Sequence, residues 1–414
     1  MEKVNRINFI KRIGLFLAVF GPGLITASAD NDAPGIATYS MAGSRYGYNF
    51  LWLLILVTFG EVIVQETAAR LGAITGKGTA DLIRERFGVK VTLFAMLCLL
   101  VANLGTTVAQ FAGIAAGAEL LGVSRYFAVP VVAFFIAFLV LRGSYNKVEK
   151  FLLVLCLAAL SYLITAFIIK PDWGEIARAA ITPRIILERD YIFAVLATIG
   201  TTITPWGIFY MQASVVDKGI DEKDFKLTKT DVVFGAIWGN IISAFIIICT
   251  GAVLYRNGIQ VEEAEQAAMA LAPMAGAWSK ILFTTGLMGA SILAAMVLPL
   301  STVYAITEAF GWERGLDNSR KEAPVFYGLY LAVVFIGVLV VLIPGIPLFP
   351  LMWLSQSMNA VLLPVLLILL LKLANDPELL GRWVNKKSQN ILTLSLTLLI
   401  TVITIGLFVI PLFK

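Results

Sequence analysis

The chain of 414 residues contains no histidine and only three cysteines. Histidine is the commonest metal ligand among side chains and the usual proton carrier near neutral pH, so its absence argues against most hydrolase and redox-metal centres. The cysteines, Cys98, Cys156 and Cys249, all fall inside apolar segments and lack metal-ligand spacing. We therefore expect small buried side chains at these positions, and neither a zinc site nor a disulfide.

Charged residues are also scarce, at 14% of the chain, whereas apolar residues make up 59%. A soluble protein of this composition would expose far more apolar surface than it could cover. Apolar runs long enough to cross a hydrocarbon layer of roughly 30 Å recur along the whole chain. Because helices satisfy their own backbone hydrogen bonds, we predict an all-α polytopic membrane protein that has the lipid bilayer as its partner.

The apolar runs predict about 11 membrane spans. They cover residues 14–43, 50–70, 91–118, 126–142, 148–169, 190–213, 231–254, 276–307, 325–343, 350–373 and 391–413. With the N-terminus in the cytoplasm, 23 of the 32 Lys and Arg residues lie on the cytoplasmic side, as the positive-inside rule expects. We therefore expect a protein of the cytoplasmic (inner) membrane with its N-terminus inside and its C-terminus outside. The net charge of +5 follows from this bias and gives little support to nucleic-acid binding.

Two spans carry a helix-breaking sequence near mid-membrane. The first has Asn-Asp-Ala-Pro-Gly at 31–35, and the sixth has Thr-Pro-Trp-Gly at 204–207. Since span one starts inside and span six outside, the two breaks indicate an inverted repeat of five plus five helices around a midplane site. We predict one transporter domain over residues 1–414, with repeats at about 14–169 and 190–373 and an extra helix at about 391–413.

Asp32 lies in the first break, where unwinding of the helix frees backbone carbonyls. A carboxylate together with carbonyls, hydroxyls and amides suits a hard divalent cation such as Mg²⁺, Ca²⁺ or Mn²⁺. Candidate co-ligands are Thr204 in the second break and Gln356 and Asn359 in span ten. Each of these three could equally form a structural hydrogen bond between helices. Asp30 either lies beside Asp32 or lines an inner vestibule.

Span two contains two further carboxylates, Glu61 and Glu66, closer to its cytoplasmic end. Glu66 lies one helical turn from Arg70, at a spacing that allows an ion pair. We expect both carboxylates to be paired or solvated, since an isolated charge within the membrane is costly.

The same residues resemble the Nramp divalent-metal transporters, whose first span carries Asp-Pro-Gly-Asn and whose sixth carries Met-Pro-His. The stretches 21–23, 42–52 and 69–87 are also similar to the family's first two spans and the loops after them, and Ser355-Gln356 to its tenth span. The resemblance implies a LeuT-type fold of inverted five-helix repeats with an alternating cavity around a metal site. Asp32 takes the place of the metal-binding Asp of the motif. No cofactor is implied, because the divalent metal ion is the substrate.

The departures from the family pattern concern ion selectivity and proton coupling. Gly35 stands where the family has its metal-binding Asn, and Thr204 where it has a Met thioether. Losing a soft ligand and a large side chain should weaken discrimination against Mg²⁺ and make room for a partly hydrated ion. The family's His is Trp206 here, and its third-span Asp and Glu fall at Thr107 and Gln110. The pattern resembles the magnesium-transporting branch and predicts import of Mg²⁺ and/or Mn²⁺, driven by the membrane potential without proton coupling.

Two alternatives stay open. A proton-coupled Mn²⁺/Fe²⁺ symporter would have to use another carboxylate, such as Asp30 or Asp32, to carry the proton. An amino-acid or amine carrier on the same fold would place a substrate amine near Asp32. An enzyme is not expected, because the sequence has no convergent acid-base or nucleophile set.

Overall fold

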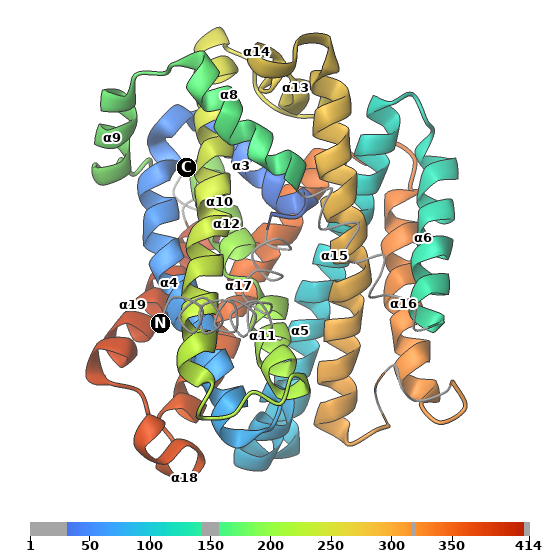
Figure 1. The fold of residues 1–414 in the computed structure, drawn as a ribbon, viewed down its shortest axis with the longest axis vertical. Coiled ribbons are helices and arrows are strands. Elements are labelled where there is room, and N and C mark those ends of the chain that lie inside the picture. The colour runs from blue at the N-terminus through green and yellow to red at the C-terminus, as the bar shows by residue number, and fades with distance from the viewer. Residues whose placement is uncertain (1–30, 143–156, 314, 316–319, 410–414) are drawn as a thin grey trace, which may run out of the picture.

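The structure is a computed structural model, and it describes residues 31–142, 157–313, 315 and 320–409. Every regular element within these ranges is a helix, and the helices form one bundle (Figure 1). The predicted all-α class is therefore confirmed. The helices in predicted spans are α3 (Ala33–Tyr46), α4 (Leu51–Thr75), α5 (Thr79–Leu120), α6 (Arg125–Leu141), α8 (Ser161–Ile169), α10 (Arg189–Thr202), α11 (Pro205–Asp217), α12 (Phe225–Val253), α15 (Ser279–Phe310), α16 (Pro324–Val341), α17 (Leu348–Ala374) and α19 (Lys387–Val409).

Helices occupy each of the predicted spans, although residues 14–30 of the first and 148–156 of the fifth lie outside the described ranges. In the described part of the chain, eight helical segments are long and apolar enough to cross a membrane, and α6 and α8 are shorter apolar helices. The third span begins earlier than predicted, at Thr79, because α5 continues across a kink at Gly88. Gly88 has a φ of 76°, which a residue without a Cβ adopts at little cost.

Short elements connect the long helices at the two ends of the bundle. At one end lie α9 (Trp173–Ile181), α13 (Ala264–Met269) and α14 (Ala272–Ala275), and at the other lies α18 (Pro377–Leu380), as Figure 1 shows. The 3-10 turns are η1 (Gly47–Phe50), η2 (Leu157–Leu160), η3 (Tyr255–Asn257), η4 (Gly276–Trp278) and η5 (Gly381–Trp383). This alternation of connections between two ends is what a polytopic membrane protein requires.

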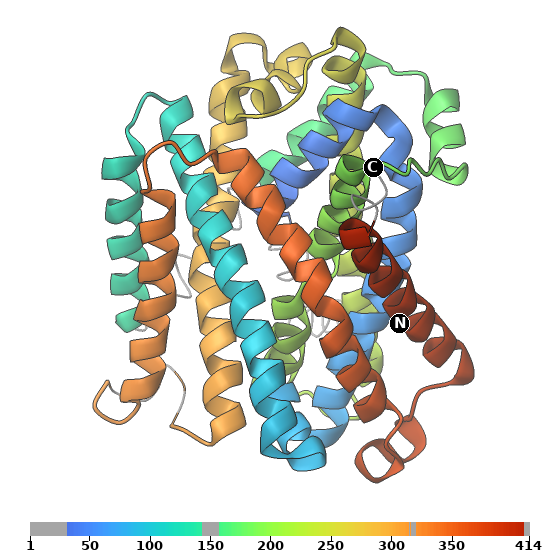
Figure 2. The ribbon, with the colours of Figure 1, turned by 180° about the vertical axis from the view of Figure 1, so that it is seen from behind.

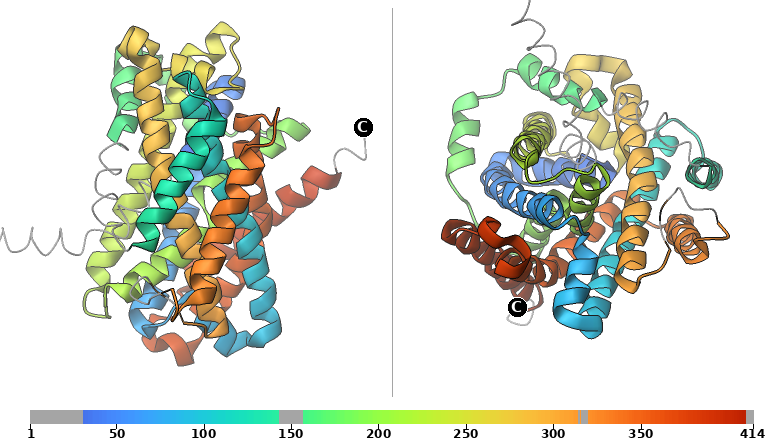
Figure 3. Two further views of the ribbon diagram at one scale, coloured as in Figure 1. Left: turned by 90° about the vertical axis from the view of Figure 1, so that its right-hand side faces the viewer. Right: turned by 60° about the horizontal axis from the view of Figure 1, so that its bottom comes forward.

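Large apolar side chains are exposed on the peripheral helices. Figures 2 and 3 show α6 in teal and α16 in orange on one side of the bundle and α19 in red on another. Their exposed residues include Phe127, Phe134, Phe335 and Val402. Such a surface is unfavourable in water and favourable against lipid tails, so it agrees with the predicted bilayer environment. Cys98 and Cys249 are buried and free, as expected, and Cys156 lies outside the described residues.

Candidate functional site

The half-helix α3 begins at Ala33, inside the predicted first span, and Asp32 is its N-cap. Asp32 has an extended backbone (φ −73°, ψ −179°), and its Oδ1 accepts a hydrogen bond of 2.9 Å from the backbone N–H of Gly35. Pro34 lies in the first turn, where its missing N–H costs no helical hydrogen bond. The site residue Gly35 thus contributes a backbone donor that fixes the carboxylate.

The second break divides the predicted sixth span into α10 and α11. Thr204 is the N-cap of α11, with its Oγ1 accepting from the backbone N–H of Gly207 at 3.3 Å. Pro205 follows directly and cannot donate to the last turn of α10, so carbonyls at the end of α10 lose their helical partners. Both predicted breaks are therefore built alike: a polar side chain caps the second half-helix, and a proline follows within two residues.

The half-helix ends do not all favour a cation. The N-termini of α3 and α11 carry the positive ends of their helix dipoles, which disfavour a cation placed nearby. The C-terminus of α10 carries the negative end and the freed carbonyls. Attraction for a cation must therefore come from the Asp32 carboxylate and from α10. Helices α3 and α10 lie side by side, as the 2.9 Å hydrogen bond between the hydroxyls of Tyr39 and Thr202 shows.

The Asp32 carboxylate is buried and is held by neutral donors only. Its Oδ2 accepts a hydrogen bond from Nε2 of Gln110 on α5, and the side chains of both residues are almost inaccessible to solvent. Within the described ranges, no lysine or arginine forms an ion pair with this carboxylate. In the same part of the chain, no three acidic or cysteine side chains converge. A metal held here would therefore be bound by one carboxylate and neutral oxygens.

Gln356 and Asn359 lie on α17, next to α10 and α5 respectively. The backbone oxygen of Gln356 lies so close to Gly200 of α10 that a Cβ at Gly200 would be 1.9 Å from it. Asn359 Nδ2 donates to Gln356 Oε1 at 3.0 Å and to Thr106 Oγ1 of α5 at 2.9 Å. Gln356 is thus placed beside the last turn of α10, whereas Asn359 links α17 to α5, which is the structural role that the sequence left open.

Two residues at the breaks make contacts that sequence reasoning did not find. Asn31 donates to the backbone oxygen of Gly239 at 3.1 Å and accepts from Ser243 Oγ at 3.1 Å, so it fastens the first break to α12. Trp206 is buried, and its Nε1 has no hydrogen-bond partner. Asp30, a predicted site residue, lies outside the described residues.

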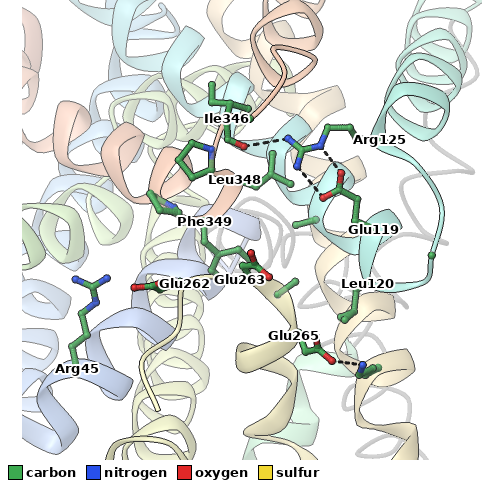
Figure 4. Close-up of a pocket in the computed structure, with 17 residues that line it drawn as sticks. Arg45, Glu119, Leu120, Arg125, Glu262, Glu263, Glu265, Ile346, Leu348 and Phe349 are labelled. Atoms are coloured by element: carbon green, nitrogen blue, oxygen red, sulfur yellow. Dashed lines mark hydrogen bonds and ion pairs between the residues drawn. The ribbon is translucent and has the colours of Figure 1, made fainter. Parts of the chain in front are cut away.

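A cavity of about 800 Å³ opens at the end of the bundle that carries α13 and α14 (Figure 4). Its charged lining residues are Glu119, Glu262, Glu263, Glu265, Arg45, Arg125 and Lys280. Two ion pairs lie on its wall, Glu119 with Arg125 and Glu265 with Lys280. Arg45 stands at the last turn of α3, 13 residues or about 20 Å along the helix from Asp32, and its guanidinium lies 4.9 Å from the ring of Trp353 on α17.

The opposite end of the bundle is closed by contacts between α11 and the α4–α5 connection. Gln212 of α11 donates to the backbone oxygen of Lys77 at 2.6 Å and accepts from Thr79. Glu66, at the same end, pairs with Arg70 at 3.5 Å and with Lys229 at 3.3 Å, which confirms the ion pairing expected for it. Glu61 is buried and accepts from Asn240 of α12 at 2.5 Å.

Comparisons with known proteins agree with this architecture. The family model described as "Natural resistance-associated macrophage protein-like" (Nramp) matches residues 23–410. The chain is 23% identical over 403 residues to the divalent metal cation transporter MntH of Bacillus subtilis (strain 168), covering 95% of this chain and 92% of that protein. A protein of the same name from Granulibacter bethesdensis is 25% identical over 394 residues, covering 91% and 84%.

Solved structures share the fold over nearly the whole chain. The Eremococcus coleocola manganese transporter matches with a TM-score of 0.77 at 19% identity, over 94% of this chain and 85% of that one. MhsT in complex with L-phenylalanine matches with a TM-score of 0.60 at 14% identity, over 94% and 98%. Mhp1, a nucleobase-cation-symport-1 family transporter, matches with a TM-score of 0.58 at 12% identity, over 94% and 91%.

The divided sixth span, the half-helix α3 and these structural matches define a polytopic membrane transporter with the LeuT fold. Since the family model covers nearly all of the sequence, the protein belongs to the Nramp family. The predicted fold class, the family resemblance and the prediction of a transporter that is not an enzyme are thereby confirmed.

Proposed function

We propose that this Nramp-family protein imports divalent cations, Mg²⁺ and/or Mn²⁺, across the cytoplasmic membrane by alternating access and without proton coupling. The observation that carries the proposal is the buried Asp32 carboxylate at the start of α3, whose two oxygens accept hydrogen bonds, among the residues that the structure describes, from the neutral groups of Gly35 and Gln110. A buried carboxylate with no cationic partner attracts a cation strongly. The relatives named as divalent metal cation transporters support this class of substrate.

The donor set that we propose for the cation beside Asp32 is made of oxygen atoms. Thr204 supplies a hydroxyl, Gln356 an amide, and the end of α10 its freed carbonyls. Hard cations such as Mg²⁺ and Mn²⁺ prefer carboxylate, carbonyl and water oxygens, and a thioether would favour softer metals. A site with a single carboxylate also leaves coordination positions for water, which Mg²⁺ releases reluctantly.

The neutral residues on α5 support transport without proton coupling. Gln110 contacts Asp32 directly, and Thr107, almost one turn away, donates to the backbone oxygen of Asn103 at 2.8 Å. Neither side chain titrates, although the family pattern has acids at both positions. The membrane potential supplies enough energy without a proton, since two charges crossing about 100 mV gain roughly 4.6 kcal/mol.

Alternating access requires one end of the bundle to open while the other closes. We assign the end with α13, α14 and the 800 Å³ cavity to the outside, because the positive-inside rule places the opposite end in the cytoplasm. The contact of Gln212 with Lys77 and Thr79 then closes the inner side, and the Arg45–Trp353 contact lies at the outer side. The two repeats, 14–169 and 190–373, would each contribute one half-helix to the moving part.

Flux measurements in proteoliposomes test the proposal. The reconstituted protein is given Mg²⁺ or Mn²⁺ outside under an inside-negative potential, and internal metal and internal pH are recorded in the same vesicles. We expect saturable entry of both ions, mutual competition, loss of entry in Asp32→Ala and no change of internal pH. Entry of Mn²⁺ alone, accompanied by acidification, would instead establish the proton-coupled symporter.

The amine-carrier alternative makes a different prediction in the same vesicles. An amino acid or polyamine in excess would then compete with Mg²⁺ for entry and would itself be accumulated. The structural match to MhsT concerns the fold alone and gives that substrate no support. A panel of amino acids and amines that leaves Mg²⁺ entry unchanged removes this alternative.

A further inference from the structure

The two polar atoms of the Gln110 side-chain amide differ in their hydrogen bonding. Nε2 donates to Asp32 Oδ2, whereas Oε1 is buried and has no hydrogen-bond partner. The structure turns the nitrogen toward the carboxylate, which is the orientation that an ionised carboxylate needs, because it can only accept a hydrogen bond. The amide group that donates to the Asp32 carboxylate therefore also carries an acceptor without a partner.

A buried acceptor without a partner is unfavourable, and most such groups in proteins are hydrogen-bonded to the protein, to water or to a ligand. Gln110 is completely buried, so bulk water does not solvate its Oε1. A cation bound at Asp32 that keeps some of its water molecules would provide the missing donor, because metal-bound water presents its hydrogens outward. The same water needs a polar acceptor next to the carboxylate, and Oε1 occupies that position.

We propose that Gln110 is a specificity-determining residue for the transported cation. Its Nε2 orients the Asp32 carboxylate, and its Oε1 accepts a hydrogen bond from a water molecule that the bound cation retains. This inference rests on the proposed function and adds to it the hydration state of the cargo. Mg²⁺ holds its water more firmly than Mn²⁺ does, so the contact favours Mg²⁺ over Mn²⁺.

The test compares Gln110→Met, Gln110→Asn and Gln65→Met with wild type in proteoliposomes. Methionine has a similar length and no strong hydrogen-bonding atom, but it carries a thioether, so Gln110→Leu, which has no ligand atom, is measured beside it and must show the same change of preference. Asparagine keeps an amide on a shorter side chain. Gln65 is the matched control, because its Nε2 donates to a different buried carboxylate, Glu61 Oε1, at 2.8 Å on α4. KM and maximal rate are measured for Mg²⁺ and Mn²⁺, and thermal unfolding of each variant is followed in detergent.

We expect Gln110→Met to raise the KM for Mg²⁺ by about tenfold, since a hydrogen bond to a charged group contributes on the order of 1.5 kcal/mol and 1.4 kcal/mol is tenfold. The KM for Mn²⁺ should rise less, so the Mg²⁺ to Mn²⁺ preference falls. Gln110→Asn should restore part of that preference, and Gln65→Met should leave it at the wild-type value. A purely structural role would lower the unfolding temperature and the maximal rate for both ions without changing their ratio.

An unchanged Mg²⁺ to Mn²⁺ preference in Gln110→Met, in a variant that folds and transports, overturns the inference while the proposed function stands. If Gln110→Met does not fold, Gln110→Asn decides, and a wild-type preference there also overturns it. Wild-type protein that carries neither ion would instead overturn the proposed function itself. The two failures are therefore distinguished by the wild-type measurement in the same experiment.

Discussion

Gln110 on α5 donates a hydrogen bond to Oδ2 of Asp32, a residue 78 positions earlier in the chain at the start of α3. Since the backbone of Gly35 holds Oδ1, the carboxylate is fixed by two helices at once. Any movement of α3 relative to α5 must break or stretch one of these hydrogen bonds. The orientation of the candidate metal ligand is therefore linked to the relative position of two helices, as a transporter that changes conformation around its cargo requires.

The first prediction separates the charge of Asp32 from its role as a helix cap. Asp32→Asn should lower kcat/KM for metal entry on the order of 100-fold, because a buried interaction between charges contributes several kcal/mol. Its effect on thermal unfolding should be small, since Asn is as good an N-cap as Asp, whereas Asp32→Ala should lose about 1 kcal/mol of stability. Flux in vesicles and unfolding in detergent measure the two effects.

Asp172 provides the control for that experiment. It caps the surface helix α9 with hydrogen bonds of 2.8 and 3.1 Å to the backbone N–H groups of Gly174 and Glu175. Asp172→Ala should reduce stability by a similar mechanism and leave KM for the metal unchanged. Equal loss of transport in Asp172→Ala and Asp32→Ala would mean that Asp32 acts only through the fold.

The second prediction concerns the hydroxyl of Thr204. Replacing it by a thioether in Thr204→Met should shift selectivity toward Mn²⁺ relative to Mg²⁺, because sulfur is a softer ligand. Thr204→Leu adds similar volume without a ligand and is the matched control. Competition of the two metals during uptake gives the ratio directly. A shift of equal size in both variants would assign the effect to cavity volume, and the ligand role of this position would be rejected.

The third prediction concerns the close approach of α10 and α17 at Gly200. A Cβ at this position would lie 1.9 Å from the backbone oxygen of Gln356 and 2.7 Å from the backbone nitrogen of Ala360. Because both atoms belong to the backbone, Gly200→Ala should force the helices apart and destabilise the protein by about 1–3 kcal/mol. Unfolding in detergent should show a lower midpoint, and flux in vesicles should show a raised KM for the metal.

Gly328 on α16 gives the opposite expectation for the same substitution. A Cβ there would have no neighbour within 4 Å, so Gly328→Ala should be neutral or stabilising by up to about 1 kcal/mol through the better helix propensity of alanine. Equal destabilisation by both substitutions would show that the steric clash with the backbone of α17 is not the cause, since of these two glycines Gly200 is the one that lies against another backbone.

The fourth prediction is a pH dependence at the connection between α11 and α12. Arg382 forms a charge-assisted hydrogen bond with Glu222, and this contact lowers the pKa of Glu222 below its usual value of 4.5. A carboxyl whose pKa is lowered by folding contributes stability above its unfolded pKa and loses it as the pH falls through the folded value. Glu222→Gln should therefore unfold slightly earlier than wild type at pH 7, and the difference should shrink as the pH falls below the usual pKa of 4.5 and through the lowered folded value.

Arg382 and Glu222 are both solvent-exposed, so the effect should also weaken at high salt. Thermal unfolding of wild type and Glu222→Gln between pH 7 and pH 3.5, at low and high salt, measures it. A difference that grows toward acid pH would show that the sign is wrong. Metal transport near neutral pH should be the same in both proteins, because Glu222 lies on an exposed connection between α11 and α12.

Much of the fold could be predicted, because its determinants are local in the chain. Apolar runs of the right length place the spans, and Pro34 and Pro205 place the breaks, since proline cannot continue a helical hydrogen-bond pattern. Asp32 also stands out locally, as a carboxylate beside a break within an apolar span. The start of α5 was predicted 12 residues too late because polar residues 79–90 are helical outside the apolar run.

The partners of the site residues could not be predicted in the same way. Gln110 donates a hydrogen bond to Asp32, Asn31 donates one to α12, and Asn359 donates one to Thr106 on α5. Each of these hydrogen bonds joins residues that are far apart in the sequence. The sequence offered both a ligand role and an interhelical role for Asn359, and only the packing of α17 against α5 shows the hydrogen bond that it makes.

By itself the sequence determined that the chain spans a membrane, where its helices break and which carboxylate lies at the first break. These properties depend on hydrophobic length and on the chemistry of single residues, which act within a few positions along the chain. Only the tertiary structure decided which neutral side chain holds Asp32, which backbones approach closely and which residues line the cavity beside α13 and α14. Those properties depend on how each helix is rotated against its neighbours, and that rotation is set by side-chain packing summed over the whole bundle.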